Sequence, residues 1–117
     1  MGERAQERRQ QARFLCSGRA EIQSLTTAMG ARGKVANLSL SGCRLMLEAT
    51  QPFERGERVE MTFCVRQLPV RVQGVVRQVR GESRIGVEFT LLTERGKRQL
   101  RELIEELAER KRRMALF

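Results

Sequence analysis

The 117-residue sequence predicts a single all-β domain, an antiparallel barrel or sandwich, that is followed by a C-terminal helix. Between residues 43 and 89, apolar and polar residues alternate with the period of two that is typical of half-buried strands. After Thr93 the apolar spacing changes to that of an amphipathic helix. With 40% hydrophobic residues, a chain of this length supports one modest core.

The first third of the chain is less regular. Residues 1–15 are polar and basic without apolar periodicity, and we expect a flexible arm there. Residues 17–25 predict the first strand, and residues 26–34, which include two glycines, predict a hairpin loop. We therefore divide the chain into an arm at residues 1–15, a barrel at 16–92 and a helix at 93–117.

Four further strands follow, each with one apolar face. These faces are formed by Cys43, Leu45 and Leu47; by Val59, Met61, Phe63 and Val65; by Val70, Val72, Gly74 and Val76; and by Ile85, Val87 and Phe89. Strands of about six residues with short turns are typical of antiparallel barrels and sandwiches, and closure removes the exposed edges of a small sheet. Gly74 inside a strand predicts a bulge or a barrel corner.

Residues 93–117 predict the helix, with Thr93 as its N-cap. We expect its apolar face to pack over an open end of the barrel. That face is formed by Leu100, Leu103, Ile104, Leu107 and Met114. The basic run Arg110–Arg113 ends the helix, where cations stabilise the helix dipole. We favour this interpretation over the binding of an acidic partner.

The composition limits the function. The net charge of +9 indicates an anionic partner such as a nucleotide, a nucleic acid, an acidic lipid or an acidic protein surface, although a merely soluble basic protein has the same charge. Without His, a Ser-His-Asp triad, a Cys-His pair and a histidine zinc site are excluded, and we expect no enzymatic activity and no cofactor. Without Trp or Tyr, we expect no specific nucleic-acid binding by base stacking.

The sequence also bears on location. Cys16, Cys43 and Cys64 show no CxxC spacing, and we expect reduced structural thiols in a cytoplasmic protein. No apolar run approaches the roughly 18 residues of a membrane span, and the N-terminus lacks the apolar segment of a secretory signal.

The basic arm contains an arginine pair, Arg9 and Arg13, with Arg8 directly before it. By itself this pattern is typical of a solvated basic arm. Arginine nevertheless forms paired hydrogen bonds with phosphate oxygens and with the O6/N7 edge of guanine. A separation of four residues also places Arg9 and Arg13 on one side of a helical turn.

Asn37, Ser39 and Gly42 form a second motif, ahead of the regular strands. Residues of these types are common in ordinary turns. The Asn side chain can also accept hydrogen bonds from the N–H groups of guanine, and a Ser hydroxyl can bind a phosphate or a base. A glycine allows a ligand to approach the backbone closely.

Together and in this order, the two motifs resemble the RxxxR and D/N-x-S-x-x-G signature of PilZ domains, which are bacterial receptors for cyclic di-GMP. The segment from Arg84 to Phe89 resembles a late strand of that family. The resemblance covers about residues 8–110 and implies a six-stranded antiparallel β-barrel with a C-terminal helix. The ligand-binding residues that it implies are Arg8, Arg9, Arg13, Asn37, Ser39 and Gly42.

The resemblance carries three further expectations. Arg8 resembles the arginine of family members that hold a stacked pair of ligands, which implies two cyclic di-GMP molecules per domain. Asn37 stands where many members have Asp, so we expect a weaker guanine contact. Arg77 is an additional candidate, for which a ligand contact and a surface salt bridge are equally good interpretations.

The leading hypothesis is a stand-alone receptor and adaptor without enzymatic activity. Cyclic di-GMP would draw the arm onto the barrel and change the surface that a downstream partner protein recognises. Two alternatives stay open: a PilZ-like protein–protein adaptor that does not bind nucleotide, and a general basic protein that binds nucleic acid through its charge.

Overall fold

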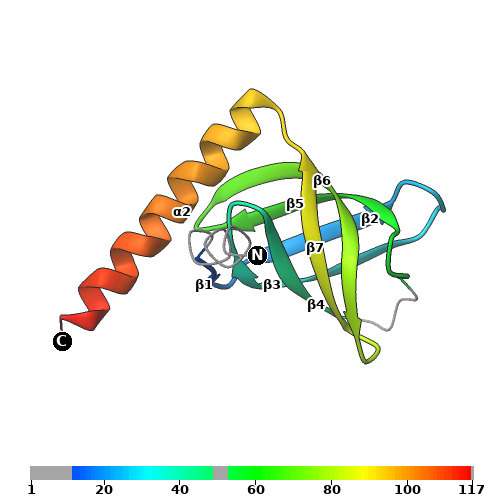
Figure 1. Ribbon diagram of the computed structural model, residues 1–117, viewed down its shortest axis with the longest axis horizontal. Helices are drawn as coiled ribbons and strands as arrows, with labels where there is room; N and C mark the ends of the chain where they lie inside the picture. The colour runs from blue at the N-terminus through cyan, green and yellow to red at the C-terminus, as the bar shows by residue number, and fades with distance from the viewer. Residues whose placement is uncertain (1–11, 49–52, 117) are drawn as a thin grey trace, which may run out of the picture.

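The computed structural model describes residues 12–48 and 53–116, so Arg8 and Arg9 lie outside the described residues. Seven strands and one long helix follow one another in this part of the chain (Figure 1). The elements are β1 (Phe14–Leu15), β2 (Arg19–Ser24), β3 (Gly30–Leu38), β4 (Gly42–Leu47), β5 (Arg58–Val65), β6 (Leu68–Arg80), β7 (Arg84–Leu91) and α2 (Glu94–Ala115).

Six of these strands close into an antiparallel barrel. Their order is β3-β2-β5-β6-β7-β4, and pairing between β3 and β4 joins the two ends of that order. Strand β1 adds two residues to the end of β3, opposite Leu38 and Asn37. The six-stranded barrel with its C-terminal helix confirms the predicted fold class.

The strand alternation predicts the core correctly. The residues of the four predicted apolar faces are buried, except Phe89, which is half-buried. Its ring stacks on Phe63 with the two centroids 6.1 Å apart. Gly74 lies at a register shift between β6 and β7, which confirms the predicted bulge. A Cβ at this position would collide with the backbone of Glu88.

Two segments differ from the sequence-based expectation. Residues 30–34 belong to β3 rather than to a loop, because they pair one by one with residues 19–23 of β2. Gly33 lies in this strand where the carbonyl of Met46 passes too close for a side chain, so the glycine marks a close strand approach and not a turn. Phe14 and Leu15 of the expected arm form β1, because Phe14 packs against the core.

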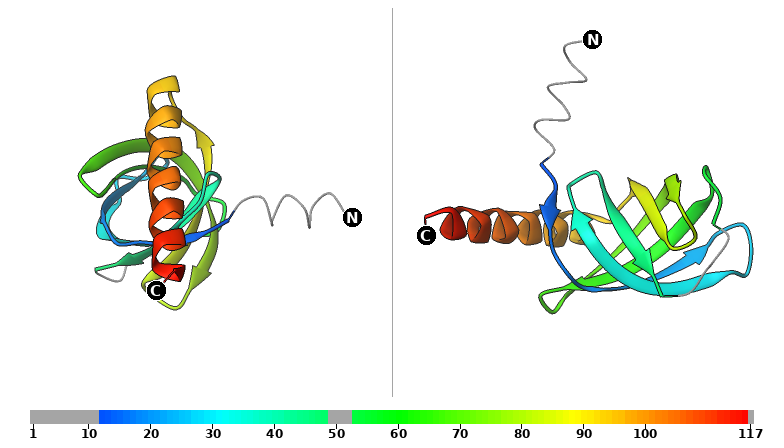
Figure 2. Two further views of the ribbon diagram at one scale, coloured as in Figure 1. Left: turned by 90° about the vertical axis from the view of Figure 1, so that its left-hand side faces the viewer. Right: turned by 90° about the horizontal axis from the view of Figure 1, so that it is seen from below.

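Helix α2 crosses one open end of the barrel (Figure 2). The hydroxyl of Thr93 accepts a hydrogen bond from the Gly96 N–H at 3.0 Å, which confirms the predicted N-cap. The predicted leucines of the helix are buried, but Met114 is 76% exposed because the last turns extend past the barrel. No helix of the described residues has the length and hydrophobicity that a membrane crossing requires.

The tip of the β5–β6 hairpin contacts this helix. Arg66 and Gln67 have φ angles of 55° and 68°, the left-handed conformation that two-residue hairpin turns require and that Asn-Gly adopts most easily. The Nε atom of Arg66 lies 2.8 Å from a carboxylate oxygen of Glu106 on α2. This ion pair links the hairpin to the helix.

Candidate functional site

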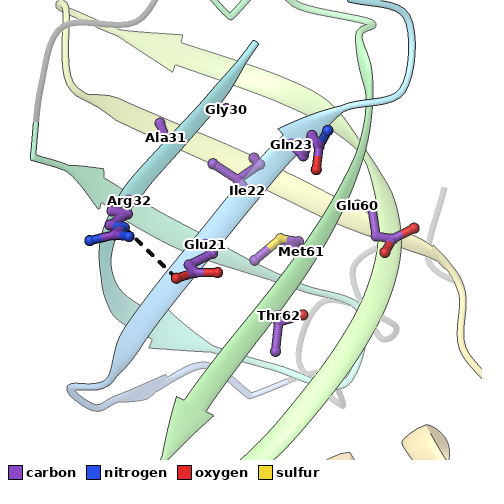
Figure 3. Close-up of a pocket in the computed structure, with 9 residues that line it drawn as sticks. All are labelled: Glu21, Ile22, Gln23, Gly30, Ala31, Arg32, Glu60, Met61 and Thr62. Atoms are coloured by element: carbon purple, nitrogen blue, oxygen red, sulfur yellow. Dashed lines mark ion pairs between the residues drawn. The ribbon is translucent and has the colours of Figure 1, made fainter. Parts of the chain in front are cut away.

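Among the hollows on the described surface of the barrel, two lie over different parts of the outer wall and differ in their charged residues. The first, of about 340 Å³, lies over β2, β3 and β5 and is shown in Figure 3. The second, of about 260 Å³, lies over β3, β4, β6 and β7 and includes Asn37 of the second motif. The chemistry of their side chains, rather than their volume, distinguishes the two.

The charged residues around the first hollow compensate one another. A carboxylate oxygen of Glu21 lies 3.8 Å from Nε of Arg32 (Figure 3), and Glu60 accepts a hydrogen bond from Nε of Arg71 at 2.7 Å. We call the surface formed by Glu21, Arg32, Glu60 and Arg71 the paired face. Its arginines already have partners, and its carboxylates repel an anionic ligand.

The second hollow lies on a row of outward-facing residues that crosses four strands. Asn37 on β3 pairs with Arg44 on β4, Arg44 with Gly86 on β7, and Gly86 with Gln78 on β6. Because Gly86 has no side chain, it leaves a gap between Arg44 and Gln78. All four residues line the hollow.

The position of Asn37 depends on a bulge in β3. Val35 and Leu38 are both buried in the core, with two residues rather than one between them. The register with β4 shifts between Val35 and Asn37. In a regular strand, the residue two places after Val35 would also point inward. The bulge therefore turns Asn37 onto the outer wall, opposite Arg44.

Two atoms in this hollow have unsatisfied hydrogen-bonding capacity. Oδ1 of Asn37 and Nε of Arg44 are buried and have no hydrogen-bond partner within the described part of the chain. A buried polar atom without a partner costs about 1–3 kcal/mol. One of these atoms accepts hydrogen bonds and the other donates them, so a ligand that offers both a donor and an acceptor satisfies both.

A second row of outward-facing residues lies next to the first. Lys34 pairs with Met46, Met46 with Arg84, and Arg84 with Arg80, and all four are exposed. We call Lys34, Arg80 and Arg84 the cationic row. None of the three forms an ion pair with a carboxylate of residues 12–48 or 53–116. Like charges directly opposite each other destabilise a sheet, and an anion bound there would reduce this repulsion.

Ser39 lies in the turn between β3 and β4, next to the hollow, and Gly42 is the first residue of β4. The buried hydroxyl of Ser39 accepts hydrogen bonds from the N–H groups of Ser41 and Gly42, each at 3.2 Å. A Cβ on Gly42 would collide with the carbonyl of Val87 on β7. These contacts fix the turn that follows Asn37. A direct contact of Ser39 or Gly42 with a ligand stays a prediction.

Arg13 is exposed and directly precedes β1. Burial is the main cause that raises the pKa of Cys43 to about 12, the nearby Cys16 raises it further, and Arg13 lowers it. The guanidinium of Arg13 is therefore within electrostatic reach of the start of β4. Arg8 and Arg9 lie outside the described residues, so a convergence of the three arginines stays a prediction.

Arg77 adopts one of its two anticipated roles. Its Nε lies 3.3 Å from a carboxylate oxygen of Glu88 on β7, and both side chains are about half exposed. This contact is the anticipated surface salt bridge, and a ligand contact of Arg77 stays a prediction. The three cysteines are free, and the described residues contain no group of three His, Cys, Asp or Glu that could hold a metal ion.

Five residues in or next to this hollow were not among the binding residues expected from the sequence. They are Lys34, Arg44, Gln78, Arg80 and Arg84. Strand alternation does predict that Arg44 and Arg84 point outward, on the side opposite to the apolar faces. The alternation does not show which strands lie next to each other in the sheet. Barrel closure brings β4 between β3 and β7, and only this arrangement places Asn37 next to Arg44.

The family model of the PilZ domain matches residues 7–106 of the chain, whereas no curated protein sequence matches it. The solved PilZ domain of YcgR from Escherichia coli with c-di-GMP is similar, with a TM-score of 0.72 and 20% identity over 92% of this chain and 97% of that one. The PilZ domain of CeSA from a cellulose synthesizing bacterium has a TM-score of 0.67 and 12% identity over 83% and 98% of the two chains.

The inhibitor of motility from Bacillus subtilis (MotI/DgrA) has a TM-score of 0.70 and 18% identity over 89% of this chain but only 51% of its own. At these identities the structural likeness establishes the fold of the barrel.

Proposed function

Because the chain belongs to the PilZ domain family, we propose that it is a receptor for cyclic di-GMP. The observation that carries this proposal is the pair of unsatisfied buried atoms, Oδ1 of Asn37 and Nε of Arg44, in the 260 Å³ hollow. The similar PilZ domain of YcgR was solved with c-di-GMP. The ligand would bind where the second motif meets the cationic row.

Guanine offers the hydrogen-bond acceptors and donors that Nε of Arg44 and Oδ1 of Asn37 lack. Guanine has hydrogen-bond acceptors at O6 and N7 and donors at N1 and N2. The guanidinium of Arg44 donates to the acceptors, and Oδ1 of Asn37 accepts from the donors. Both contacts replace an unsatisfied buried group, so each contributes more than a contact formed at a solvated surface.

The two phosphates of the ligand require cations. Arg80 and Arg84 line the same hollow, and Lys34 lies in the same row. Arg8, Arg9 and Arg13 of the arm would contact the ligand from its outer side. Ordering the arm costs about 1–2 kcal/mol per residue in backbone entropy, which charge-assisted hydrogen bonds to the phosphates would offset. Two ligand molecules per domain would place the second one between the arm and the first.

The signal to a downstream partner would pass through β1. Leu15 pairs with Asn37 in the site, and the ring of Phe14 lies 5.7 Å from Nζ of Lys111 on α2. Strand β1 thus contacts Asn37 of the proposed ligand site on one side and the C-terminal helix on the other. If the arm closes over the ligand, this contact is the direct route by which the exposed end of α2 would change for a partner protein.

Titration calorimetry with cyclic di-GMP tests the proposal, with GMP as the control ligand. We expect selective binding that is lost in the Arg9→Ala/Arg13→Ala double variant, and the measured stoichiometry distinguishes one ligand from two. A folded protein that does not bind cyclic di-GMP would contradict the receptor and favour the nucleotide-independent adaptor.

Competition separates the receptor from a general nucleic-acid binder. Excess RNA should not displace cyclic di-GMP from a specific site, whereas a purely electrostatic binder would show affinity for any RNA with a steep salt dependence. Amide exchange of residues 1–15 with and without ligand tests the closure of the arm. Unchanged protection would contradict closure even if the nucleotide binds.

A further inference from the structure

We infer that two exposed apolar side chains, Leu15 and Met46, are further binding residues of the site and cover the ligand where it meets Asn37 and Arg44. The inference rests on the proposed receptor function and extends the residues of that same site. Its basis is the position of the two side chains, their exposure, and a comparison with the paired face.

Leu15 and Met46 adjoin the two residues that carry the unsatisfied atoms. Leu15 on β1 pairs directly with Asn37 on β3, and side chains at such positions lie on one face with their Cβ atoms about 4.5–5.5 Å apart. Met46 follows Arg44 on β4 by two residues, so both point to the outer wall. Met46 also lines the 260 Å³ hollow. Asn37 and Arg44 therefore each have one apolar neighbour on the outer wall.

Both apolar side chains are exposed to solvent. Leu15 is 87% exposed, the highest fraction among the large hydrophobic residues that the structure describes, whereas Phe14 before it packs against the core. Met46 is 46% exposed and lies between Lys34 and Arg84 in the second row of outward-facing residues. A single exposed hydrophobic residue is ordinary on a protein surface. Two that adjoin a pair of unsatisfied buried polar atoms provide the apolar part of a ligand site.

The paired face has no equivalent among its described residues. Around the first hollow, the large hydrophobic residues Ile22 and Met61 are buried in the core, and the outward-facing residues are polar, charged or small. The residues that line this hollow also contain no unsatisfied buried side-chain atom within the described part of the chain. Exposed apolar side chains and unsatisfied polar atoms thus occur together on one outer face of the barrel.

A nucleotide base requires both kinds of group. Hydrogen-bonding atoms lie along its edge, and its two faces are flat π surfaces that pack against apolar side chains. A base whose edge contacts Asn37 and Arg44 comes within reach of Leu15 and Met46, and this contact removes apolar surface from water. It also excludes water from the hydrogen bonds to Asn37 and Arg44, which strengthens them.

Titration calorimetry of the full chain with cyclic di-GMP tests the inference on Leu15→Ala and Met46→Ala. We expect each variant to lower the affinity about three- to tenfold, because apolar burial is lost. Leu91→Ala is the matched control, with a change below about twofold, because Leu91 is also exposed but does not line the hollow. Leu15→Met and Met46→Leu keep an apolar side chain of similar volume and should stay within about twofold of the wild type.

Two further readouts separate an apolar contact from a structural or electrostatic role. The heat-capacity change of binding should be less negative in the alanine variants, because it reports apolar burial. The salt dependence of the affinity should stay the same, because no charge is altered. Should an alanine variant not fold, Leu15→Asn or Met46→Gln takes its place with the same expected loss.

The outcomes distinguish this inference from the receptor proposal. If the wild type binds cyclic di-GMP and an alanine variant binds it equally well, the assignment of that residue is wrong and the receptor stands. Equal losses in Leu91→Ala would overturn both assignments, because any exposed leucine would then suffice. If the wild type does not bind cyclic di-GMP, the receptor and the inference are both wrong.

Discussion

The two outer faces of the barrel have similar cations but differ in how their charges are compensated. On the paired face, Arg32 and Arg71 each contact a glutamate. On the face with the 260 Å³ hollow, neither Arg44 nor the cationic row has a carboxylate partner within the described residues. An arginine that is paired with a carboxylate must break that ion pair before it binds a ligand, which reduces the net free energy of binding. An arginine without a carboxylate partner has no such pair to break. The difference teaches that missing partners, more than the number of charges or the size of a hollow, identify the site.

The largest change in affinity is expected from a substitution of Arg44, whose Nε donor is unsatisfied. Arg44→Gln should lower the affinity for cyclic di-GMP by about 10- to 100-fold, because a paired contact with a guanine edge is worth about 1–3 kcal/mol. Titration calorimetry measures it, and Arg71→Gln on the paired face is the matched control, with a change below about twofold. Equal losses in the two variants would mean that net charge alone drives binding.

A charge reversal at Arg84 would create in the cationic row the arginine–glutamate pairing that is found on the paired face. Arg84→Glu places a carboxylate opposite Arg80 in the cationic row. We expect the affinity for cyclic di-GMP to fall about tenfold, while the free energy of unfolding rises by about 0.2–1 kcal/mol because a cross-strand repulsion becomes an attraction. Urea denaturation and calorimetry on one preparation measure both. A decrease in both quantities would show that the repulsion between Arg80 and Arg84 is not what the ligand relieves.

The two regions also differ in the burial of their thiols. Burial raises the pKa of Cys43 on β4 from its ordinary 9.0 to about 12, whereas Cys64 on β5 is exposed. The native state therefore holds the Cys43 proton more tightly than the unfolded chain does. The associated stability is complete below about pH 9 and decreases by about 1.4 kcal/mol per pH unit as the pH rises toward 12.

Urea denaturation at pH 8 and pH 10 tests this linkage, with Cys43→Ala as the control. We expect a loss on the order of 1 kcal/mol at pH 10 in the wild type, and a smaller loss in the variant. The same loss in both proteins would assign the pH dependence to other groups.

The smallest effect is expected on the paired face itself. Glu60→Gln removes the partner of Arg71, and an exposed ion pair contributes about 0.2–1 kcal/mol to stability. We expect a decrease of this size in the free energy of unfolding and no change in the affinity for cyclic di-GMP. A second binding event in this variant would show that any arginine without a partner on this barrel suffices for a site.

Most of the fold could be predicted from the sequence. Inward and outward residues alternate over β4 to β7, and the apolar residues of α2 recur with the spacing of a helix. The sequence was insufficient at residues 30–34, where pairing with β2 outweighs the turn preference of two glycines. For the site, the sequence indicated Asn37 but not Arg44. The contact between them depends on barrel closure, which is a property of the whole sheet. Whether atoms such as Oδ1 of Asn37 are unsatisfied is likewise decided by three-dimensional packing.

Strand β3 contributes Val35 and Leu38 to the interior and Asn37 to the outer wall. The bulge between Val35 and Asn37 adds one residue to the strand at this point. Substitutions on the outer wall therefore leave the interior packing undisturbed, and interior changes do not alter what the wall presents. A deletion of Ala36 would remove the bulge and restore the regular alternation of β3, with Val35 and Leu38 pointing inward and Asn37 between them pointing outward.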